Sequence, residues 1–272
     1  MLILSALLVC NLQTYAQELP PVTNFSPNDY SAGNQNWMIS QADNKNLYFA
    51  NSTGLLEYNG ERWRLYPVPN KSIVRSVKVV KEKIFTGAYM EAGYWTPRNN
   101  GELVFQSLIS KFPDLNDGEQ FWDIEYIDGQ VVFRSFAGIY LYDLKRDEVT
   151  KMANPTGKPV SNIFNFEDEL YFQLVGEGLY KFEKGQPRQI ISGEQLGDIA
   201  IMHLYDLDED GLSMITGNSE FYKIRSGLLE QFYGQLSESI GKPNALDALD
   251  LDNGNLVLGT VGSGVIEIAQ DG

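Results

Sequence analysis

Two acidic stretches of this sequence could in principle hold a metal ion. Asp206–Gly211 reads DLDEDG and matches the first half of a calcium loop, in which alternate carboxylates converge on the cation. The twelfth loop position would be Gly217 instead of the bidentate Glu that such loops use. A similar stretch, Asp250–Gly254, recurs before another apolar run. We therefore expect both stretches to be hairpin turns, and we predict no metal site.

Nucleophilic and phosphate-binding motifs are also incomplete. His203 is the only histidine and Cys10 the only cysteine, so the chain lacks the residues for a histidine metal triad or a Ser-His-Asp relay. We expect His203 to be a strand residue with a satisfied ring. Residues 259–264, GTVGSG, are glycine-rich but lack the Lys-Ser/Thr of a phosphate loop, and they join two predicted strands. We predict no cofactor.

The elements that would position any site come from a repeat. The stretch NLYFANSTGLLEYNGERW, residues 46–63, alternates apolar and polar side chains and returns in weaker form along the chain. The residues that open the third strand of each unit are spaced by 39, 45, 40, 41 and 45 residues, and they are Gly54, Gly93, Gly138, Gly178, Ser219 and Gly264. A period near 40 built from short alternating strands is typical of β-propeller blades.

The first unit predicts four strands, at Trp37–Gln41, Leu47–Ala50, Leu55–Tyr58 and Trp63–Tyr66. Asn59-Gly60 between the last two favours a type I′ turn. Both faces of this sheet are apolar, so one unit cannot bury its surface alone and must stack on neighbours. The five further units span Val74–Gln106, Phe121–Met152, Val160–Ile191, Ile201–Phe232 and Ala245–Ala269.

The predicted fold is therefore all-β, a propeller of four-stranded blades, of which six are visible. Leu108–Gln120 and Tyr233–Asn244 are the longest connections between units. The last unit has no outer strand before Gly272, and a closed ring needs every sheet edge paired. We expect the chain to be part of a longer protein with seven or more blades.

Composition and charge exclude some partners. The chain has 272 residues, of which 43% are hydrophobic and 21% charged, which is typical of a globular protein. Its formal net charge is −15, and a nucleic-acid surface needs a basic face to neutralise phosphates. Direct binding to nucleic acid or to an anionic bilayer surface is therefore not expected.

The N-terminus indicates export. Residues 1–16, MLILSALLVCNLQTYA, carry a short apolar run and end on a small residue, as a secretory signal does, although no basic residue precedes the run. A buried N-terminal strand is the alternative. Removal of residues 1–16 would also remove Cys10, and a cysteine-free exported chain suits a bacterial periplasm. We predict a signal peptide at residues 1–16 and a propeller over residues 17–272.

Several stretches together resemble a known family. They are ELPPVTNFSPNDYSAGNQNWMISQ, LYFANSTGLLEYNGERWRLYPVP, IVRSVKV, IFTGAYMEAGYW, EQFW and LVLGTVGSGVIEI. They resemble the N-terminal half of bacterial two-component regulator propeller proteins of the triple-tyrosine type. The resemblance implies a propeller on the periplasmic face of the inner membrane, followed in the family by a triple-tyrosine domain, one transmembrane helix and a cytoplasmic output such as a helix-turn-helix. None of those parts is encoded in these residues. It also implies a homodimer formed through them.

A ligand site is predicted at one mouth of the propeller channel, where the loops after the second and fourth strands gather. Aromatic faces beside planar polar groups suit a sugar or a peptide. The nine predicted site residues are Asn51, Arg75, Tyr89, Glu91, Gln120, Trp122, Arg134, Gln173 and Asn218. All could instead be ordinary loop residues. Trp37 and Trp122 recur in NWMI and FWDI, which favours inner-strand packing for both.

The function expected from these observations is that of a non-catalytic sensor propeller for a glycan, peptide or protein cue. A secreted propeller enzyme acting on polysaccharide is one alternative, because glycosidases use paired carboxylates and the chain has 36 acidic residues. The sequence singles out no such pair. A protein-interaction scaffold without a small ligand is the other alternative.

Overall fold

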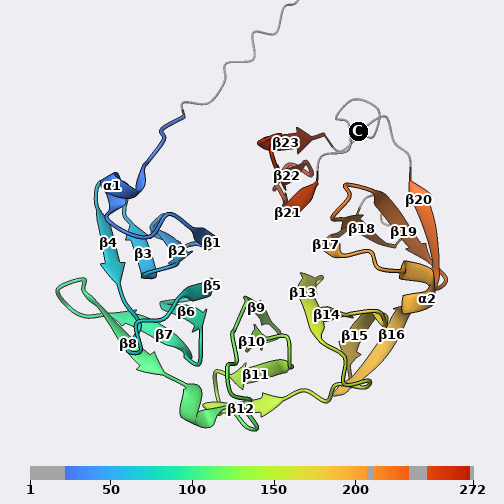
Figure 1. Cartoon of the computed structure of the whole chain (residues 1–272), viewed down its shortest axis with the longest axis horizontal. Helices are drawn as coiled ribbons and strands as arrows, with labels where there is room; N and C mark the ends of the chain where they lie inside the picture. The colour runs from blue at the N-terminus through green and yellow to red at the C-terminus, as the bar shows by residue number, and fades with distance from the viewer. Residues whose placement is uncertain (1–21, 207–210, 233–243, 270–272) are drawn as a thin grey trace, which may run out of the picture.

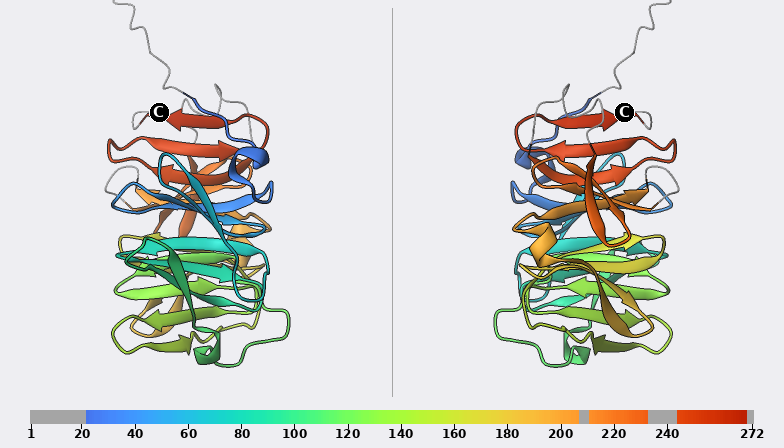
Figure 2. Two further views of the ribbon diagram at one scale, coloured as in Figure 1. Left: turned by 90° about the vertical axis from the view of Figure 1, so that its left-hand side faces the viewer. Right: turned by 90° about the vertical axis from the view of Figure 1, so that its right-hand side faces the viewer.

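Each predicted repeat unit forms its own antiparallel sheet in the computed structural model, which describes residues 22–206, 211–232 and 244–269. The sheets stand around a common axis as six blades, and consecutive strands of each blade pair in order from the axis outward (Figure 1). Figure 2 shows the blades from two sides, with their strands lying across the view one above another. The prediction of an all-β propeller is confirmed.

The first three blades contain twelve strands. Blade 1 consists of β1 (Asn36–Gln41), β2 (Leu47–Asn51), β3 (Gly54–Tyr58) and β4 (Trp63–Tyr66). Blade 2 consists of β5 (Val74–Val80), β6 (Lys83–Ala88), β7 (Ala92–Pro97) and β8 (Leu103–Ser107). Blade 3 consists of β9 (Asp123–Ile127), β10 (Gln130–Arg134), β11 (Ile139–Asp143) and β12 (Glu148–Lys151).

The last three blades follow the same order, and the last has three strands within the described residues. Blade 4 consists of β13 (Val160–Phe166), β14 (Glu169–Leu174), β15 (Gly178–Glu183) and β16 (Gln186–Ser192). Blade 5 consists of β17 (Ile201–Asp206), β18 (Leu212–Thr216), β19 (Phe221–Arg225) and β20 (Leu228–Phe232). Blade 6 consists of β21 (Ala245–Asp250), β22 (Leu256–Thr260) and β23 (Val265–Ile268).

Three short helices, which the strand pattern does not predict, lie outside the sheets. Helix α1 (Pro27–Tyr30) precedes blade 1, and α2 (Gly193–Leu196) joins blades 4 and 5. The 3-10 helix η1 (Ile109–Lys111) lies in the long connection from β8 to β9. Just after η1, Phe112 packs edge-on against Phe121 at 5.0 Å between ring centroids. This connection therefore belongs to the core between blades 2 and 3.

Apolar side chains join each blade to the next in sequence. Five hydrophobic clusters fill the spaces between blades 1 and 2, 2 and 3, 3 and 4, 4 and 5, and 5 and 6. Fully buried Tyr140, Phe172 and Leu258 belong to three of them. Within the described residues, no such cluster joins blade 6 to blade 1. A blade that has a neighbour on each side therefore has both of its faces buried, as expected.

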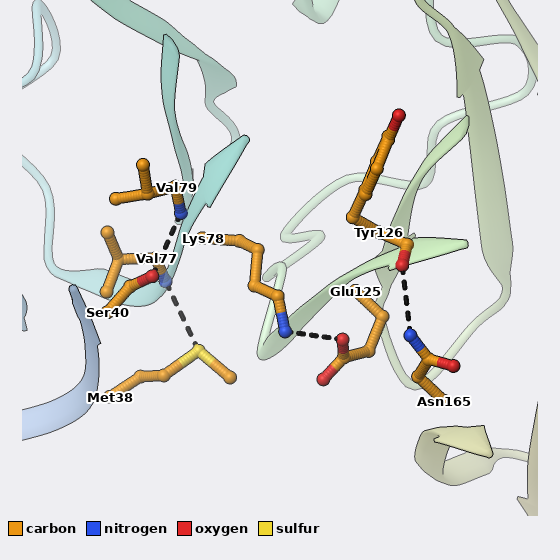
Figure 3. Close-up of polar contacts among 8 residues, drawn as sticks. All are labelled: Met38, Ser40, Val77, Lys78, Val79, Glu125, Tyr126 and Asn165. Carbon is orange, nitrogen blue, oxygen red and sulfur yellow. Dashed lines mark hydrogen bonds and ion pairs between the residues drawn. The ribbon is translucent and has the colours of Figure 1, made fainter. Parts of the chain in front are cut away.

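Polar side chains also connect the innermost strands, as Figure 3 shows. The backbone N–H groups of Val77 and Val79 on β5 donate to Met38 Sδ at 3.3 Å and Ser40 Oγ at 2.9 Å on β1. Farther along the ring, Asn165 Nδ2 on β13 donates to the carbonyl of Tyr126 on β9 at 3.1 Å. An innermost strand has a ladder partner on one side only, so these bonds satisfy its other edge.

One local prediction is wrong. The Asn59-Gly60 loop is not a type I′ turn, because only Gly60 of the two has a positive φ, 89°. The pairing of Tyr58 with Trp63 leaves a longer loop, in which Asn59 Oδ1 accepts hydrogen bonds from the backbone N–H groups of Glu61 and Arg62. The Asn side chain thus replaces the backbone turn.

In blades 1 and 4 the glycine that opens the third strand has a steric cause. Gly178 at the start of β15 has φ 105°, and a β carbon there would lie 2.0 Å from the carbonyl oxygen of Ile191 on β16. At Gly54, with φ 149°, the same atom would lie 2.5 Å from the carbonyl oxygen of Tyr66. The outer strand approaches so closely that only glycine fits.

We expect Gly178→Ala to destabilise the propeller by at least twice as much as Gly185→Ala. Both glycines have positive φ, which costs Ala about 1–2 kcal/mol, but a β carbon at Gly185 meets open space. Thermal melts of the two variants and the native protein measure the difference. Equal losses in melting temperature would contradict the steric explanation.

Candidate functional site

An open cavity of about 620 Å³ lies in the middle of the ring. Its walls are residues of the innermost strands of blades 1, 3, 4, 5 and 6 and of neighbouring positions. Among them are Trp37, Phe49, Trp122, Asp123, Glu125, Arg134, Asn162, Met202, His203, Leu246 and Asp247. A cavity of this size with mixed polar and apolar walls can hold a small ligand.

A β-bulge at the start of the innermost strand aims one extra side chain in five of the blades. The strand pairing skips one residue there, and the extra residues are Trp37, Arg75, Ser161, Met202 and Leu246. In blade 3, Trp122 directly precedes β9, and its N–H donates to the carbonyl of Arg134 at 2.9 Å. Bulges re-aim side chains next to functional sites in many sheets. The repeated architecture thus presents a different residue from each blade.

Arg75 lies between two tryptophans contributed by the neighbouring blades. Its guanidinium carbon is 4.0 Å from the ring centroid of Trp37 and 4.3 Å from that of Trp122. The two indoles meet edge to face, with centroids 6.2 Å apart. Burial lowers the pKa of Arg75. Its Nε and Nη1 atoms are buried, and they have no hydrogen-bond acceptor among the described residues.

Arg134, the last residue of β10, is a second buried cation of the mouth. It is only 7% exposed, and its guanidinium lies 5.4 Å from the ring of Phe136, which is itself 5.6 Å from Trp122. Burial lowers the pKa of Arg134, opposed in part by the charge of Asp123. As in Arg75, Nε and Nη1 are buried without an acceptor in the described part of the chain.

Asp123 opposes Arg134 across the β9–β10 pair but forms no ion pair with it within 4.0 Å. Burial among protein atoms raises the pKa of Asp123 to about 7, and the charge of Glu125 adds to the rise. Arg134 and Lys78 act in the opposite direction. Glu125 itself is ion-paired with Lys78 at 2.6 Å, as Figure 3 shows. Asp123 and Glu125, two of the carboxyl groups that line the cavity, therefore lie in different electrostatic surroundings.

Of the nine predicted site residues, the structure brings Arg75, Trp122 and Arg134 together at the channel mouth. Gln120 lies beside them, lining a smaller cavity of about 270 Å³ with Trp122 and Phe136. Tyr89 pairs with Gln120 in an isolated β-bridge and is partly exposed. Trp122, which lines both cavities, is the residue that connects the two groups.

Three other predicted site residues are buried and engaged in the framework. The Asn51 amide donates to the Gly33 carbonyl at 2.7 Å. Glu91 accepts from the Ser107 hydroxyl at 2.5 Å. Gln173 donates to the Ile199 carbonyl at 2.7 Å and accepts from the Ile201 N–H at 3.0 Å, which ties blade 4 to blade 5. Asn218 is exposed in the turn between β18 and β19, apart from the mouth cluster.

The motifs with possible chemistry take structural positions where they are described. His203 lies on β17, with Nε2 2.9 Å from Asp250 Oδ2 on β21. Residues 259–264 run from the end of β22 through an exposed turn to β23, as expected. Leu207–Asp210 of the calcium-like stretch and the signal peptide predicted at residues 1–16 lie outside the described residues. In the described ranges, no group of three or more His, Cys, Asp or Glu residues could hold a metal ion.

Sequence reasoning missed Asp123 and Phe136, and it assigned Trp37 to packing. Trp37 is 40% exposed and Phe136 is 51% exposed, so both present ring surface to solvent. Asp123 follows Trp122 directly, and the predicted hairpin of blade 3 would have placed it opposite Arg134. The strand register therefore held a usable signal for Asp123. No sequence pattern indicated that Arg75 would pack against tryptophans of two other blades.

The fold and its channel define a β-propeller with an open central cavity. No family model matches the chain, and no curated protein matches its sequence. Solved structures match the fold at low identity. The extracellular domain of BT4673 from B. thetaiotaomicron, assigned to a one-component system, superposes with a TM-score of 0.65 at 14% identity, over 89% of this chain and 33% of that one.

Two further solved structures match at a similar level. The extracellular domain of BT3049 from B. thetaiotaomicron, assigned to a hybrid two-component system, gives a TM-score of 0.64 at 18% identity, over 88% of this chain and 34% of that one. The structure of YCF48 bound to D1 peptide superposes with a TM-score of 0.64 at 10% identity, over 86% of this chain and 77% of that one. This chain thus spans about a third of the length of the two bacterial neighbours. A search of the described helices for a segment able to cross a membrane found none.

We expect Asp123→Asn to gain stability relative to the native protein as the pH rises from 5 to 8. The folded-state pKa of about 7 lies above the ordinary value of 3.8, so the folded protein keeps a proton that the unfolded chain has lost. The free energy of unfolding of the native protein therefore falls as the pH rises from 3.8 to about 7, by about 1.4 kcal/mol per pH unit at most. Asn cannot ionise. A difference in melting temperature that does not change with pH would contradict this assignment.

We also expect Arg134→Met to raise the melting temperature, with a gain on the order of 1 kcal/mol, because the buried Nε and Nη1 atoms of Arg134 have no acceptor among the described residues and their burial costs solvation energy. Arg188→Met is the matched control, since Arg188 is a more exposed residue paired with Glu183 at 3.2 Å. Arg188→Met should change the free energy of unfolding by less than about 0.5 kcal/mol. A loss of stability in Arg134→Met would show that this guanidinium is satisfied in the native protein.

Proposed function

We propose that this propeller is a sensory, non-catalytic binding domain that receives a small ligand at the channel mouth. The main support for this proposal is the Trp37–Arg75–Trp122 stack, because it combines flat aromatic surface with planar polar groups at the entrance of the central cavity. The stack joins side chains from blades 1, 2 and 3. A ligand bound there would contact three blades at once, so its binding would be coupled to their relative position.

The comparisons support a sensory context at the level of the fold. The bacterial neighbours are extracellular domains of systems of the one-component or hybrid two-component kind, and this chain matches about a third of each. We propose that the propeller is exported, faces the periplasm at the inner membrane, and belongs to a longer signalling protein. In that protein further blades, a triple-tyrosine domain, a membrane helix and a transcriptional output would follow, and dimerisation would occur through those parts.

A propeller enzyme acting on polysaccharide is a second candidate, favoured by one observation. Asp123 has its pKa raised to about 7, whereas Glu125, two residues along the same strand, is ion-paired with Lys78. A neutral acid near an ionised carboxylate is the combination that glycosidases use. The non-catalytic proposal requires that the protein releases no product from a polysaccharide that it binds.

The proposal predicts that an oligosaccharide or peptide from a screening panel raises the melting temperature of the native propeller, because a ligand that binds only the folded state stabilises it. Trp122→Ala should weaken that ligand at least tenfold by removing the stacking surface, while Trp122→Phe should retain most of the affinity. Trp63→Phe, outside the channel, is the control. Titration calorimetry measures the affinities.

The same samples separate the alternatives. Reducing ends released from a bound polysaccharide, and lost in Asp123→Asn, would establish the enzyme instead. Binding of a folded protein partner with no response to the whole panel would establish a scaffold. A ligand whose affinity is unaffected by Trp122→Ala would place the binding site elsewhere and contradict the proposal.

A further inference from the structure

The guanidinium groups of Arg75 and Arg134 at the mouth each have two buried nitrogen atoms that lack an acceptor within the described residues. The chain carries 36 acidic and 21 basic residues, so carboxylate partners are in excess. Other partly buried cations form an ion pair with a carboxylate: Lys78 pairs with Glu125 at 2.6 Å, and Lys111 pairs with Asp147 at 2.8 Å. Arg134 lines the cavity, and Arg75 packs against Trp122 of the cavity wall; each has two buried nitrogen atoms without an acceptor among the described residues.

The nearest carboxyl group does not fill this role. Asp123 faces Arg134 across the strand pair but stays beyond ion-pair distance, and its raised pKa leaves it largely protonated below about pH 7. A buried guanidinium presents N–H groups in a planar fork that matches the two oxygens of a carboxylate or sulfate. The free N–H groups of Arg134 therefore call for an oxyanion supplied from outside the chain.

The surroundings of the two cations define the rest of the ligand. Phe136 lies 5.4 Å from the Arg134 guanidinium and 5.6 Å from Trp122, and Trp122 in turn covers Arg75. The cations are thus linked by a row of aromatic rings, and Phe136 at its outer end is 51% exposed. Flat apolar faces of this kind stack on the ring of a sugar. Arg134 and Trp122 line the cavity of about 620 Å³, which has room for one or two such rings, and Trp122 and Phe136 line the smaller cavity of about 270 Å³ beside it.

We propose that the channel mouth binds an acidic sugar, whose carboxylate or sulfate group accepts hydrogen bonds from Arg134 and Arg75 while the sugar ring stacks on Trp122 and Phe136. This inference rests on the proposed binding function and names its ligand class. The net charge of −15 repels anions at long range, so an anion would be held by these local groups and not by a general attraction to the protein.

The experiment compares three probes of nearly equal size: glucuronate, glucose 6-sulfate and glucose. Dissociation constants come from tryptophan fluorescence and ligand-observed NMR, with inorganic sulfate as a fourth sample. At least one acidic sugar should bind about tenfold or more tightly than glucose, since a charge-assisted hydrogen-bond pair is worth that factor or more. Comparing glucuronate with glucose 6-sulfate shows whether the site prefers a carboxylate or a sulfate group.

Variants connect the preference to the residues. Arg134→Gln should bring the acidic probes to the affinity of glucose, and Arg75→Gln should reduce the preference as an independent change. Arg62→Gln is the matched control, because it removes the same charge from a highly exposed side chain of blade 1 that does not line the cavity. It should leave all affinities within twofold of the native values.

The outcomes distinguish this inference from the proposed function. Equal affinity for glucose and both acidic sugars, or a preference unchanged in Arg134→Gln, overturns the acidic-sugar inference and leaves a neutral-ligand sensor intact. Binding of inorganic sulfate as tight as that of the acidic sugars, or of an acidic peptide but of no sugar, also overturns it. If none of the three sugars binds, the inference fails, and the screening panel alone decides the proposed function.

Discussion

The structure depends on a constraint that no single blade can meet: each sheet has two apolar faces and must be covered on both. Tyr48 and Leu55 of blade 1 pack against Val77 and Trp95 of blade 2, and equivalent contacts recur between the next pairs. Because each interface is built from side chains of two blades, the sheets are stable only side by side. The ring arrangement and the central cavity both follow from this.

A second requirement applies at the axis, where the innermost strand of each blade has one free edge. In an open sheet such an edge would be exposed to other chains. Here the Ser40 hydroxyl and the Met38 sulfur accept hydrogen bonds from the neighbouring strand, and the Asn162 amide donates to the Ile201 carbonyl at 2.7 Å. The inner strands are therefore held in register with one another. Side chains at the channel mouth consequently occupy fixed positions on a rigid frame.

The two guanidinium groups of the mouth differ from the buried carboxylates of the blades that have hydrogen-bond partners. Glu57 in blade 1 is buried but accepts hydrogen bonds from the hydroxyls of Tyr48 and Tyr66. Glu119 likewise accepts from the hydroxyls of Ser135 and Tyr140. Arg75 and Arg134 have no such acceptors in the described part of the chain. The buried nitrogen atoms of these two guanidinium groups, which lack an acceptor among the described residues, carry an energetic cost that a bound ligand would remove.

The sequence by itself determined the repeat, the strands and their order, because alternation and spacing are local properties of the chain. It also predicted that Arg75, Trp122 and Arg134 share one mouth, since the antiparallel order fixes which ends of the strands lie together. It placed all three in loops, whereas Arg75 lies in β5 and Arg134 is the last residue of β10. It mispredicted the Asn59-Gly60 turn, where a side chain replaced the backbone geometry. Only the tertiary structure decided that Arg75 lies between Trp37 and Trp122. Those three residues come from three blades, and the distances between them depend on how the sheets stack around the axis, which no local pattern encodes.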